Sequence, residues 1–206
     1  MKSSHYVLQA TGINRYLEAS EVIDFENPEV AALSREIFSR SENEIDFVKN
    51  AFEFVRDEIS HTADINGDIV TVAASEVLRE GQGVCYAKSH LLAAILRGKK
   101  IPTGFCYQKI ILDDELNPYI IIHGLNAVFI QNKWARLDAR GNKQGVNAQF
   151  SLDEERLAFL VRPEKGEEDI PIIFAAPDKN IVSALTQTEK FEDLWHNLPT
   201  KVCDDL

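Results

Sequence analysis

The stretch EGQGVCYAKSHLLAAILRGKKIP, residues 80–102, places a cysteine between a glycine-containing turn and an amphipathic segment. One face of that segment carries the apolar residues Ala87, Leu91, Leu92 and Ile95, and Gly98 ends the pattern. This spacing predicts a helix that runs through the middle of the core. Cys85 then lies in the first turn, where unpaired backbone N–H groups and the helix dipole favour a negative charge. Because a thiol attacks as its thiolate, this position suits a nucleophile.

Three further helices are predicted before this one. Asn27 and Pro28 form a helix start, with Asn as the cap and Pro at the first helical position. Ser41 and Glu44 match a capping box. They open a helix whose apolar residues recur at steps of three and four: Ile45, Val48, Phe52, Val55 and Ile59. A short helix is expected over residues 74–79, stopping at Gly81.

After the cysteine helix, the periodicity changes from helical to strand-like. An apolar run containing Phe105, Tyr107 and Ile111 predicts a strand, and residues 113–118 predict a turn. A second strand is expected over 119–130 and a third over 134–138, joined by a tight turn at 131–133. The remainder is expected to hold a helix near 153–160, a strand at 170–175 and a last helix toward Trp195. Helices followed by antiparallel strands define an α+β fold, here one domain over residues 1–206.

Composition narrows the possible partners and compartment. The chain carries 33 acidic and 22 basic residues, a net charge of −11, which argues against nucleic acid and anionic membranes as partners. Neither a signal-peptide core nor an apolar run of membrane-spanning length is recognisable. The three cysteines, Cys85, Cys106 and Cys203, cannot all pair and lack CxxC spacing, so no metal site is expected. We expect a reducing, cytoplasmic setting.

A nucleophilic cysteine needs a histidine that accepts its proton, and the chain has five. His90 lies on the same helix but faces another side, and His5 and His196 lie in terminal segments. His61, in RDEISHTAD, follows the second helix, but nothing in the local sequence fixes it near the cysteine. His123, in IIIHGLNAVFI, falls within a predicted strand. It points either into a core or toward a site.

Asp138, in WARLDARGN, is the candidate that would orient this imidazole. A two-residue turn at Asn132 and Lys133 places Asp138 opposite Ala127, on the same face of the sheet as His123. The two side chains are then offset by four residues, too far for a hydrogen bond. Direct opposition needs an earlier turn or a bulge.

Structural roles compete with the catalytic ones at all three positions. A lone Cys is more often packing than nucleophile, and a lone strand His is more often structural. Asp138 also suits a turn before Arg140 and Gly141. The residues alone leave catalysis and packing about equally favoured.

The arrangement resembles the transglutaminase-like superfamily, a branch of papain-like thiol enzymes. The resemblance rests on FVRDEISHTAD, GVCYAKSHLLAAILRGKKIPTGFCYQ, HGLNAVF and WARLDARGNK, in that order, and centres on residues 45–143. It implies a papain-like core in which the cysteine helix packs against an antiparallel sheet. It also implies that Cys85 is the nucleophile, His123 the general base and acid, and Asp138 the orienting carboxylate.

The implied chemistry is acyl transfer from a peptide or small amide through a thioester, with no cofactor. Water as the acceptor makes a cysteine protease or amidase, and an amine makes a cross-linking enzyme. The oxyanion of the intermediate needs hydrogen-bond donors. The backbone N–H of Cys85 is one, and Gln82 is the preferred side chain, with Tyr86 and Gln108 as further candidates.

Some features depart from the family pattern. Leu125 stands two residues after His123, where the family often has Trp, and Ala-Arg follows Asp138 in place of Pro-Thr. Lys88 is expected to form an ion pair with an acidic residue, or else to meet a substrate carboxylate. Two other functions stay open: an arylamine-N-acetyltransferase-like activity, whose typical loop fits EGQGVC poorly, and an inactive binding or scaffold module.

Overall fold

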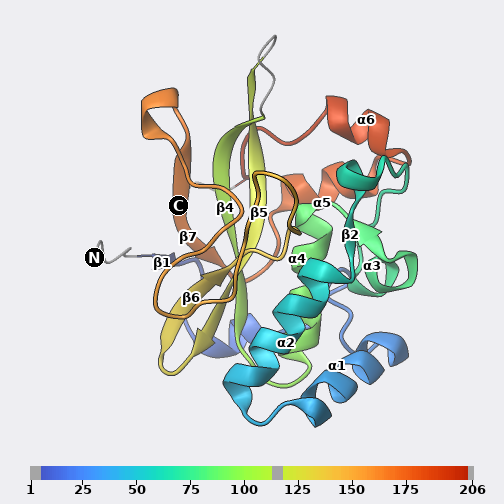
Figure 1. Ribbon diagram of the computed structural model, residues 1–206, viewed down its shortest axis with the longest axis vertical. Coiled ribbons are helices and arrows are strands. Elements are labelled where there is room, and N and C mark those ends of the chain that lie inside the picture. Colours follow the sequence, from blue (N-terminus) through green and yellow to red (C-terminus); the bar gives the residue numbers. More distant parts are fainter. Residues whose placement is uncertain (1–5, 113–117, 204–206) are drawn as a thin grey trace.

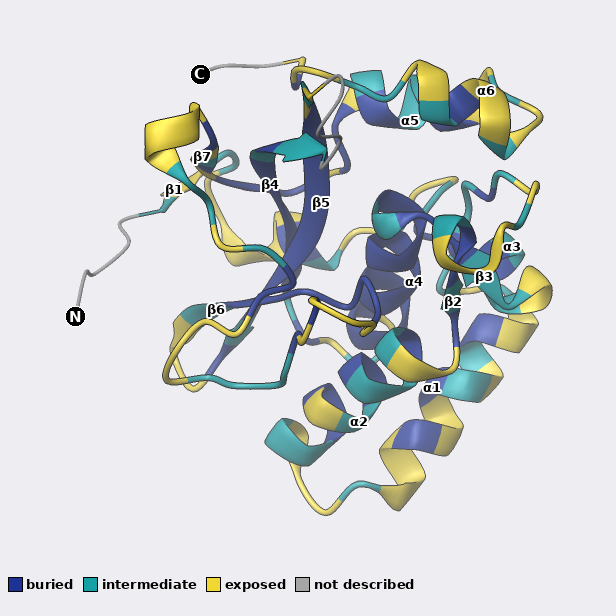
Figure 2. Ribbon diagram, turned by 45° about the horizontal axis from the view of Figure 1, so that its top comes forward, coloured by how far each residue is buried: buried dark blue, intermediate teal, exposed yellow. Residues whose placement is uncertain are grey.

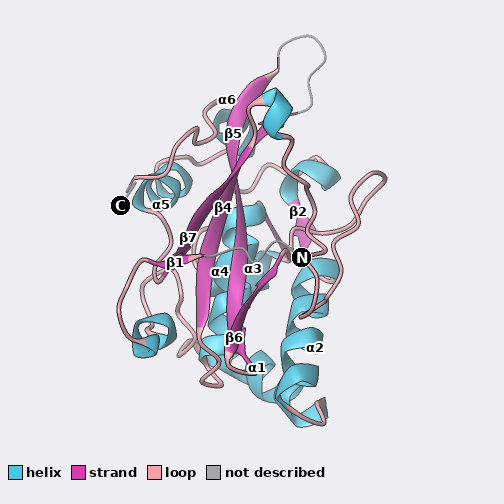
Figure 3. Cartoon of the chain, turned by 90° about the vertical axis from the view of Figure 1, so that its left-hand side faces the viewer, coloured by secondary structure: helices cyan, strands magenta, loops and turns pink. Residues whose placement is uncertain are grey.

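The computed structural model describes residues 6–112 and 118–203. Its centre is a five-stranded sheet of order β1-β7-β4-β5-β6, antiparallel except for the parallel β1–β7 pair. The long strands β4 and β5 twist around each other through most of the molecule (Figures 1 and 3). The strands are β1 Val7–Leu8, β4 Thr103–Leu112, β5 Tyr119–Ile130, β6 Lys133–Leu137 and β7 Glu168–Phe174.

Helices form a second layer against this sheet (Figure 1). The layer comprises α1 Pro28–Arg40, α2 Glu44–Asp57, α3 Ala74–Glu80 and α4 Cys85–Arg97, followed late in the chain by α5 Lys179–Thr186 and α6 Phe191–His196. A separate parallel pair, β2 Ser60–His61 and β3 Gln82–Gly83, joins the end of α2 to the start of α4. Single 3-10 turns occur at Ile13–Leu17, Thr62–Ile65 and Pro163–Lys165.

The cysteine helix lies in the core, as its sequence predicts. Every residue of α4 from Tyr86 to Arg97 is buried (Figure 2). It packs between β5 on one side and α1, α2 and α3 on the other. Cys85, at the exposed end, is the one residue of α4 that is only partly buried. A buried helix of this kind holds its first turn rigidly, because close-packed neighbours leave it no room to move.

Local capping signals explain most helix boundaries. Asn27 accepts the Glu29 N–H at the start of α1, as expected. At α2 the cap is Asn43, which accepts the Asp46 N–H, so the prediction that Ser41 caps this helix is wrong. The Ser41 hydroxyl donates instead to Ile37 O and closes the end of α1.

The β5–β6 turn lies one residue earlier than the sequence analysis assumes. Ile130 pairs with Lys133, so Gln131 and Asn132 form the turn, with φ of 51° and 61°. Two successive positive φ values define the turn type that matches strand twist. The register that places Asp138 opposite Ala127 is therefore wrong. Continued one step beyond the last pair, Asn126 with Leu137, the ladder brings Asp138 level with Leu125.

The region after residue 146 departs most from expectation. No helix forms over 153–160, because backbone groups there bond elsewhere: the Ala158 N–H donates to Asp138, and Arg156 O accepts from the Gln149 N–H. Helix α5 was not predicted, although Asp178 caps it through the N–H groups of Asn180 and Ile181. The strand at 170–175 and the helix near Trp195 correspond to β7 and α6. The turn predicted at 113–118 lies outside the described residues except for position 118.

The α+β class and the papain-like arrangement of a cysteine helix on an antiparallel sheet are confirmed. Across residues 6–112 and 118–203, no helix is both long and apolar enough to cross a membrane.

Candidate active site

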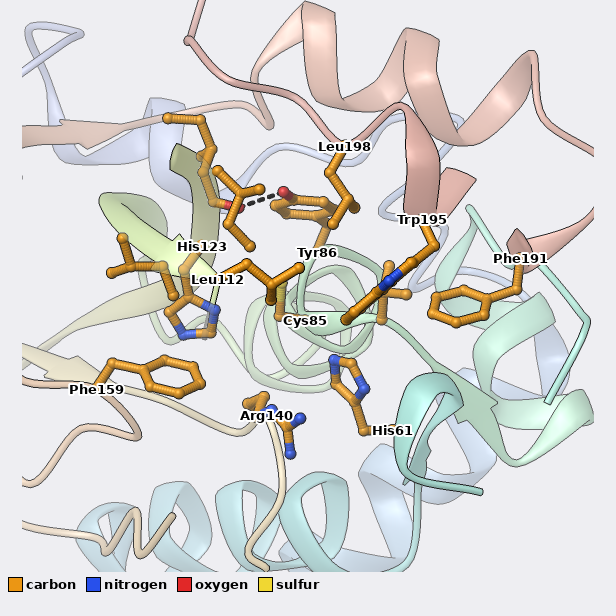
Figure 4. A pocket seen from close by; sticks show the side chains of 14 residues that line it. His61, Cys85, Tyr86, Leu112, His123, Arg140, Phe159, Phe191, Trp195 and Leu198 are labelled. Carbon is orange, nitrogen blue, oxygen red and sulfur yellow. Dashed lines mark hydrogen bonds between the residues drawn. The ribbon is translucent and has the colours of Figure 1, made fainter. Parts of the chain in front are cut away.

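A cavity of about 70 Å³ opens at the first turn of α4. Cys85 lies at its centre, between His123 from β5 and His61 from β2 (Figure 4). Trp195 of α6 lies beside the thiol, and Phe191 lines the cavity beyond it (Figure 4). The other lining residues are mostly apolar: Val84, Tyr86, Ile110, Leu112, Ile121, Ile122, Arg140, Phe159 and Leu198. The only thiol in this cavity is thus surrounded by groups that limit its contact with water.

Tyr86 fixes the start of α4 against the sheet. Its hydroxyl donates to the carbonyl of Ile122, the residue before His123. The ring occupies the space beside Gly124, where an added Cβ would lie 2.7 Å from Tyr86 Cδ1. Glycine is therefore required at this point of β5. This contact holds the helix that bears Cys85 in register with the strand that bears His123.

His123 links the other two predicted residues. Its Nε2 donates to Oδ2 of Asp138 at 2.9 Å, and its ring lines the cavity on one side of Cys85 (Figure 4). Since Nε2 is used by the carboxylate, Nδ1 is the nitrogen left for the thiol. Burial disfavours the charged imidazole, but the charges of Asp138 and Cys85 and the hydrogen bond to Asp138 outweigh it and raise the pKa of His123 to about 10.

Asp138 is held by the chain around it. Its side chain is fully buried and accepts the N–H of Ala158 at 3.0 Å and the N–H of Arg140 at 3.2 Å, besides the imidazole. Burial alone would raise the pKa of this carboxyl, but the His123 charge and these hydrogen bonds together lower it. The loop over residues 139–158 thus supplies the donors that keep Asp138 ionised and directed at His123.

The structure brings Cys85, His123 and Asp138 together. Two of the three side chains expected to donate to the oxyanion lie outside this cavity. Gln82 does not line the cavity; its Oε1 is buried beside Gly67 and has no hydrogen-bond partner in the part of the chain that the structure describes. Gln108 lies opposite His123 on β4, but its Nε2 donates to Asp169 at 2.9 Å and it is not among the lining residues. Tyr86 lines the cavity, with its hydroxyl committed to Ile122.

Lys88 makes neither of the contacts expected of it. It is fully buried, and its Nζ donates to the carbonyls of Ile59 and Arg56 (3.4 Å to the latter), at the end of α2. Carbonyls at a helix C-terminus lack intrahelical donors, so this amine satisfies them. Burial and the charge of Arg140 lower the pKa of Lys88 to about 7, against the attraction of Asp138.

His61, whose position the local sequence does not fix, also lines the cavity. The β2–β3 pair sets it beside Gly83, two residues before the thiol. Next to it, Arg140 forms a two-pronged ion pair with Asp64, at 2.9 Å for one of the two contacts. The signal that would have located His61 is its place in RDEISHTAD, one of the segments that carries the family resemblance.

No cluster of three or more His, Cys, Asp and Glu side chains suited to a metal is found among residues 6–112 and 118–203. The side chains that converge here supply a thiol, a histidine base beside it and a buried carboxylate bonded to that base. Such a set suits attack on a carbonyl carbon followed by proton delivery to the departing group.

Comparison with known proteins places the chain in a family of thiol enzymes. Residues 31–139, just over half of the chain, match the transglutaminase-like superfamily. The chain belongs to that superfamily, and the resemblance noted in the sequence is confirmed. No curated protein matches the sequence.

Two solved structures resemble the fold. A “putative cysteine protease” from Cytophaga hutchinsonii is 20% identical, with a TM-score of 0.52 over 64% of this chain and 43% of that one. The periplasmic domain of TgpA from Pseudomonas aeruginosa is 16% identical, with a TM-score of 0.47 over 62% and 46%. The chain thus matches less than half the length of either protein, and the likeness concerns the fold.

Proposed function

We propose that this protein is a thiol enzyme that cleaves or transfers an acyl group at the amide bond of a peptide or small amide. Cys85 is the nucleophile and forms a thioester, His123 moves the proton, and Asp138 orients His123. The observation that supports this most strongly is the position of His123, which lies beside Cys85 in the cavity and is hydrogen-bonded to a fully buried carboxylate.

The chemistry proceeds in two halves. His123 takes the thiol proton, and the Cys85 thiolate attacks the amide carbonyl carbon to form a C–S bond. As the intermediate collapses, the C–N bond breaks and the imidazolium gives its proton to the leaving nitrogen. Water or an amine then attacks the thioester carbon while His123 accepts its proton. The C–S bond breaks, and His123 returns that proton to the Cys85 sulfur. Water yields a carboxylic acid and an amine yields a new amide.

The test uses the full chain and a tagged iodoacetamide probe, with candidate peptides and amides as competitors. A substrate should slow labelling of Cys85 and should release a new amine that mass spectrometry detects. Adding a primary amine acceptor separates transfer from hydrolysis by the mass of the acyl product. Cys85→Ser should abolish both signals, whereas Cys203→Ser, which changes an exposed thiol outside the cavity, should leave both intact.

If no competitor slows labelling and no amide is cleaved, the alternative of a binding module without catalysis gains support. We also propose that the protein works in a reducing compartment, since its three cysteines are free. Purification under oxidising conditions should then inactivate the Cys85 thiol, and dithiothreitol should restore it.

A further inference from the structure

The proposed reaction places a negative charge on the carbonyl oxygen, and that charge needs two donors. The backbone N–H of Cys85, at the start of α4, supplies one. Neither Gln82 nor Gln108 lines the cavity, and the Tyr86 hydroxyl is committed to Ile122. Among the lining residues, the side chains of His61, Arg140 and Trp195 also carry N–H groups, and Arg140 is paired with Asp64.

His61 occupies the required place. Its ring lies on the other side of Cys85 from His123, with one ring nitrogen facing the thiol (Figure 4). The parallel pairing of His61 with Gly83 fixes its backbone to the loop that leads directly into Cys85. Donor and nucleophile are thus held by the same short structural unit, which is the rigidity that oxyanion stabilisation needs.

The surroundings of His61 suit a donor and not a base. The residue is 9% exposed, and its buried Nδ1 has no hydrogen-bond partner among residues 6–112 and 118–203. Burial and the charges of Arg140, Lys88 and His123 keep the pKa of His61 well below 6.5, against the opposing effect of Asp64. Neutral imidazole carries one N–H. Among the described residues no carboxylate is hydrogen-bonded to His61, whereas His123 has Asp138.

We propose that His61 is a catalytic residue whose Nε2–H donates to the oxyanion; this rests on the proposed function. When the Cys85 thiolate attacks, the C–S bond forms and the carbonyl π electrons move onto oxygen. The Cys85 N–H and His61 Nε2–H bind that oxygen. Collapse re-forms the C=O bond and expels the leaving group, and His61 keeps its proton throughout.

Two reactions of the same thiol test this role in the full chain. Alkylation by iodoacetamide displaces iodide at a saturated carbon and develops no oxyanion, whereas acylation by p-nitrophenyl acetate does. His61→Phe keeps an aromatic ring but removes the N–H. It should slow the p-nitrophenolate burst by about 10²-fold or more while leaving iodoacetamide alkylation within about twofold. His61→Gln, whose amide carries N–H donors, should recover part of the burst.

An unchanged burst in His61→Phe would overturn the proposal, as would equal losses in both reactions, since these would indicate a role in forming the thiolate or in packing. His196→Gln, at an exposed position outside the cavity, is the control. If His61→Phe does not fold, the same comparison is made with His61→Gln alone.

A measurement on the unsubstituted protein tests the same role without relying on the folding of either His61 variant. In 15N-histidine-labelled protein, an aldehyde that adds to Cys85 should shift the Nε2 resonance of His61, and no shift would contradict the proposal. Failure of the proposed function is distinguishable, because Cys85 would then show no enhanced alkylation in the parent chain.

Discussion

The Nε2 of His123 lies 2.9 Å from the Oδ2 of Asp138, although the strand register brings Asp138 level with Leu125, two residues further along β5. The contact is therefore a diagonal one across the end of β6. It forms because the two residues share a face and because β6 ends at Leu137, which frees Asp138 to be positioned by the N–H groups of Arg140 and Ala158.

Replacement of Asp138 by Asn should impair chemistry more than it impairs folding. Loss of the negative charge removes a major cause of the high pKa of His123, so this pKa should fall from about 10. We expect the p-nitrophenyl acetate burst to slow by about 10²-fold or more. The amide NH2 that Asp138→Asn introduces would face one of the N–H groups that Asp138 now accepts. We expect this mismatch to lower the free energy of unfolding by about 1–3 kcal/mol.

Histidine NMR titration and thermal unfolding measure the two effects of Asp138→Asn separately. Asp153→Asn is the control, since this side chain is 95% exposed and forms a surface ion pair with Lys133. A His123 pKa that stays near 10 in Asp138→Asn would contradict the described coupling.

Phe159 shields the His123–Asp138 pair. Its ring meets the imidazole edge to face, with centroids 4.9 Å apart. Phe159→Ala should admit water and weaken the attraction between the buried charges, so the pKa of His123 should move toward 6.5. Phe159→Leu, which still excludes water, should shift it much less. The same NMR titration measures both, and equal shifts would show that the ring itself, not water exclusion, sets the pKa.

Lys88 should make stability depend on pH above neutrality. Burial lowers its pKa from 10.5 to about 7 in the folded chain, so between pH 7 and 10 the unfolded chain binds more protons. The free energy of unfolding should therefore rise with pH across this window, by about 1.4 kcal/mol for each pKa unit of difference.

Lys88→Met should remove this rise, whereas Lys165→Met, at an exposed position, should retain it. Urea unfolding at pH 7, 8.5 and 10 gives the comparison. Parallel pH profiles for the parent and Lys88→Met would show that this amine keeps an ordinary pKa in the folded chain.

Periodicity predicted the elements that carry Cys85 and His123, because both the buried helix and the long strand leave strong local patterns. Strand parity also put Asp138 on the face of His123. The offset was wrong, since a one-residue change in the turn at Gln131 and Asn132 alters every pair after it. The helix predicted near residues 153–160 does not form, and the Ala158 N–H there donates to Asp138.

His61 could not be located by such patterns. It reaches the cavity through a two-residue pairing with Gly83, a contact between segments more than 20 residues apart in the chain that local spacing does not encode. Gln82 was favoured for its nearness to Cys85 in sequence, yet its side chain turns toward Gly67. Gln82 is close to Cys85 in the sequence, but its side chain points away from the thiol because a strand directs alternate residues to opposite sides.

The most direct test of the central claim is the rate of iodoacetamide alkylation of each cysteine in the full chain at pH 6.5, followed by peptide mass spectrometry. Cys203, which is exposed, serves as the reference, and Cys106 should be unreactive because burial raises its pKa to about 12. Cys85 should react far faster than both and should lose this advantage in His123→Ala. Equal rates at Cys85 and Cys203, or a fast Cys85 that persists in His123→Ala, would contradict the assignment of Cys85 as a nucleophile activated by His123.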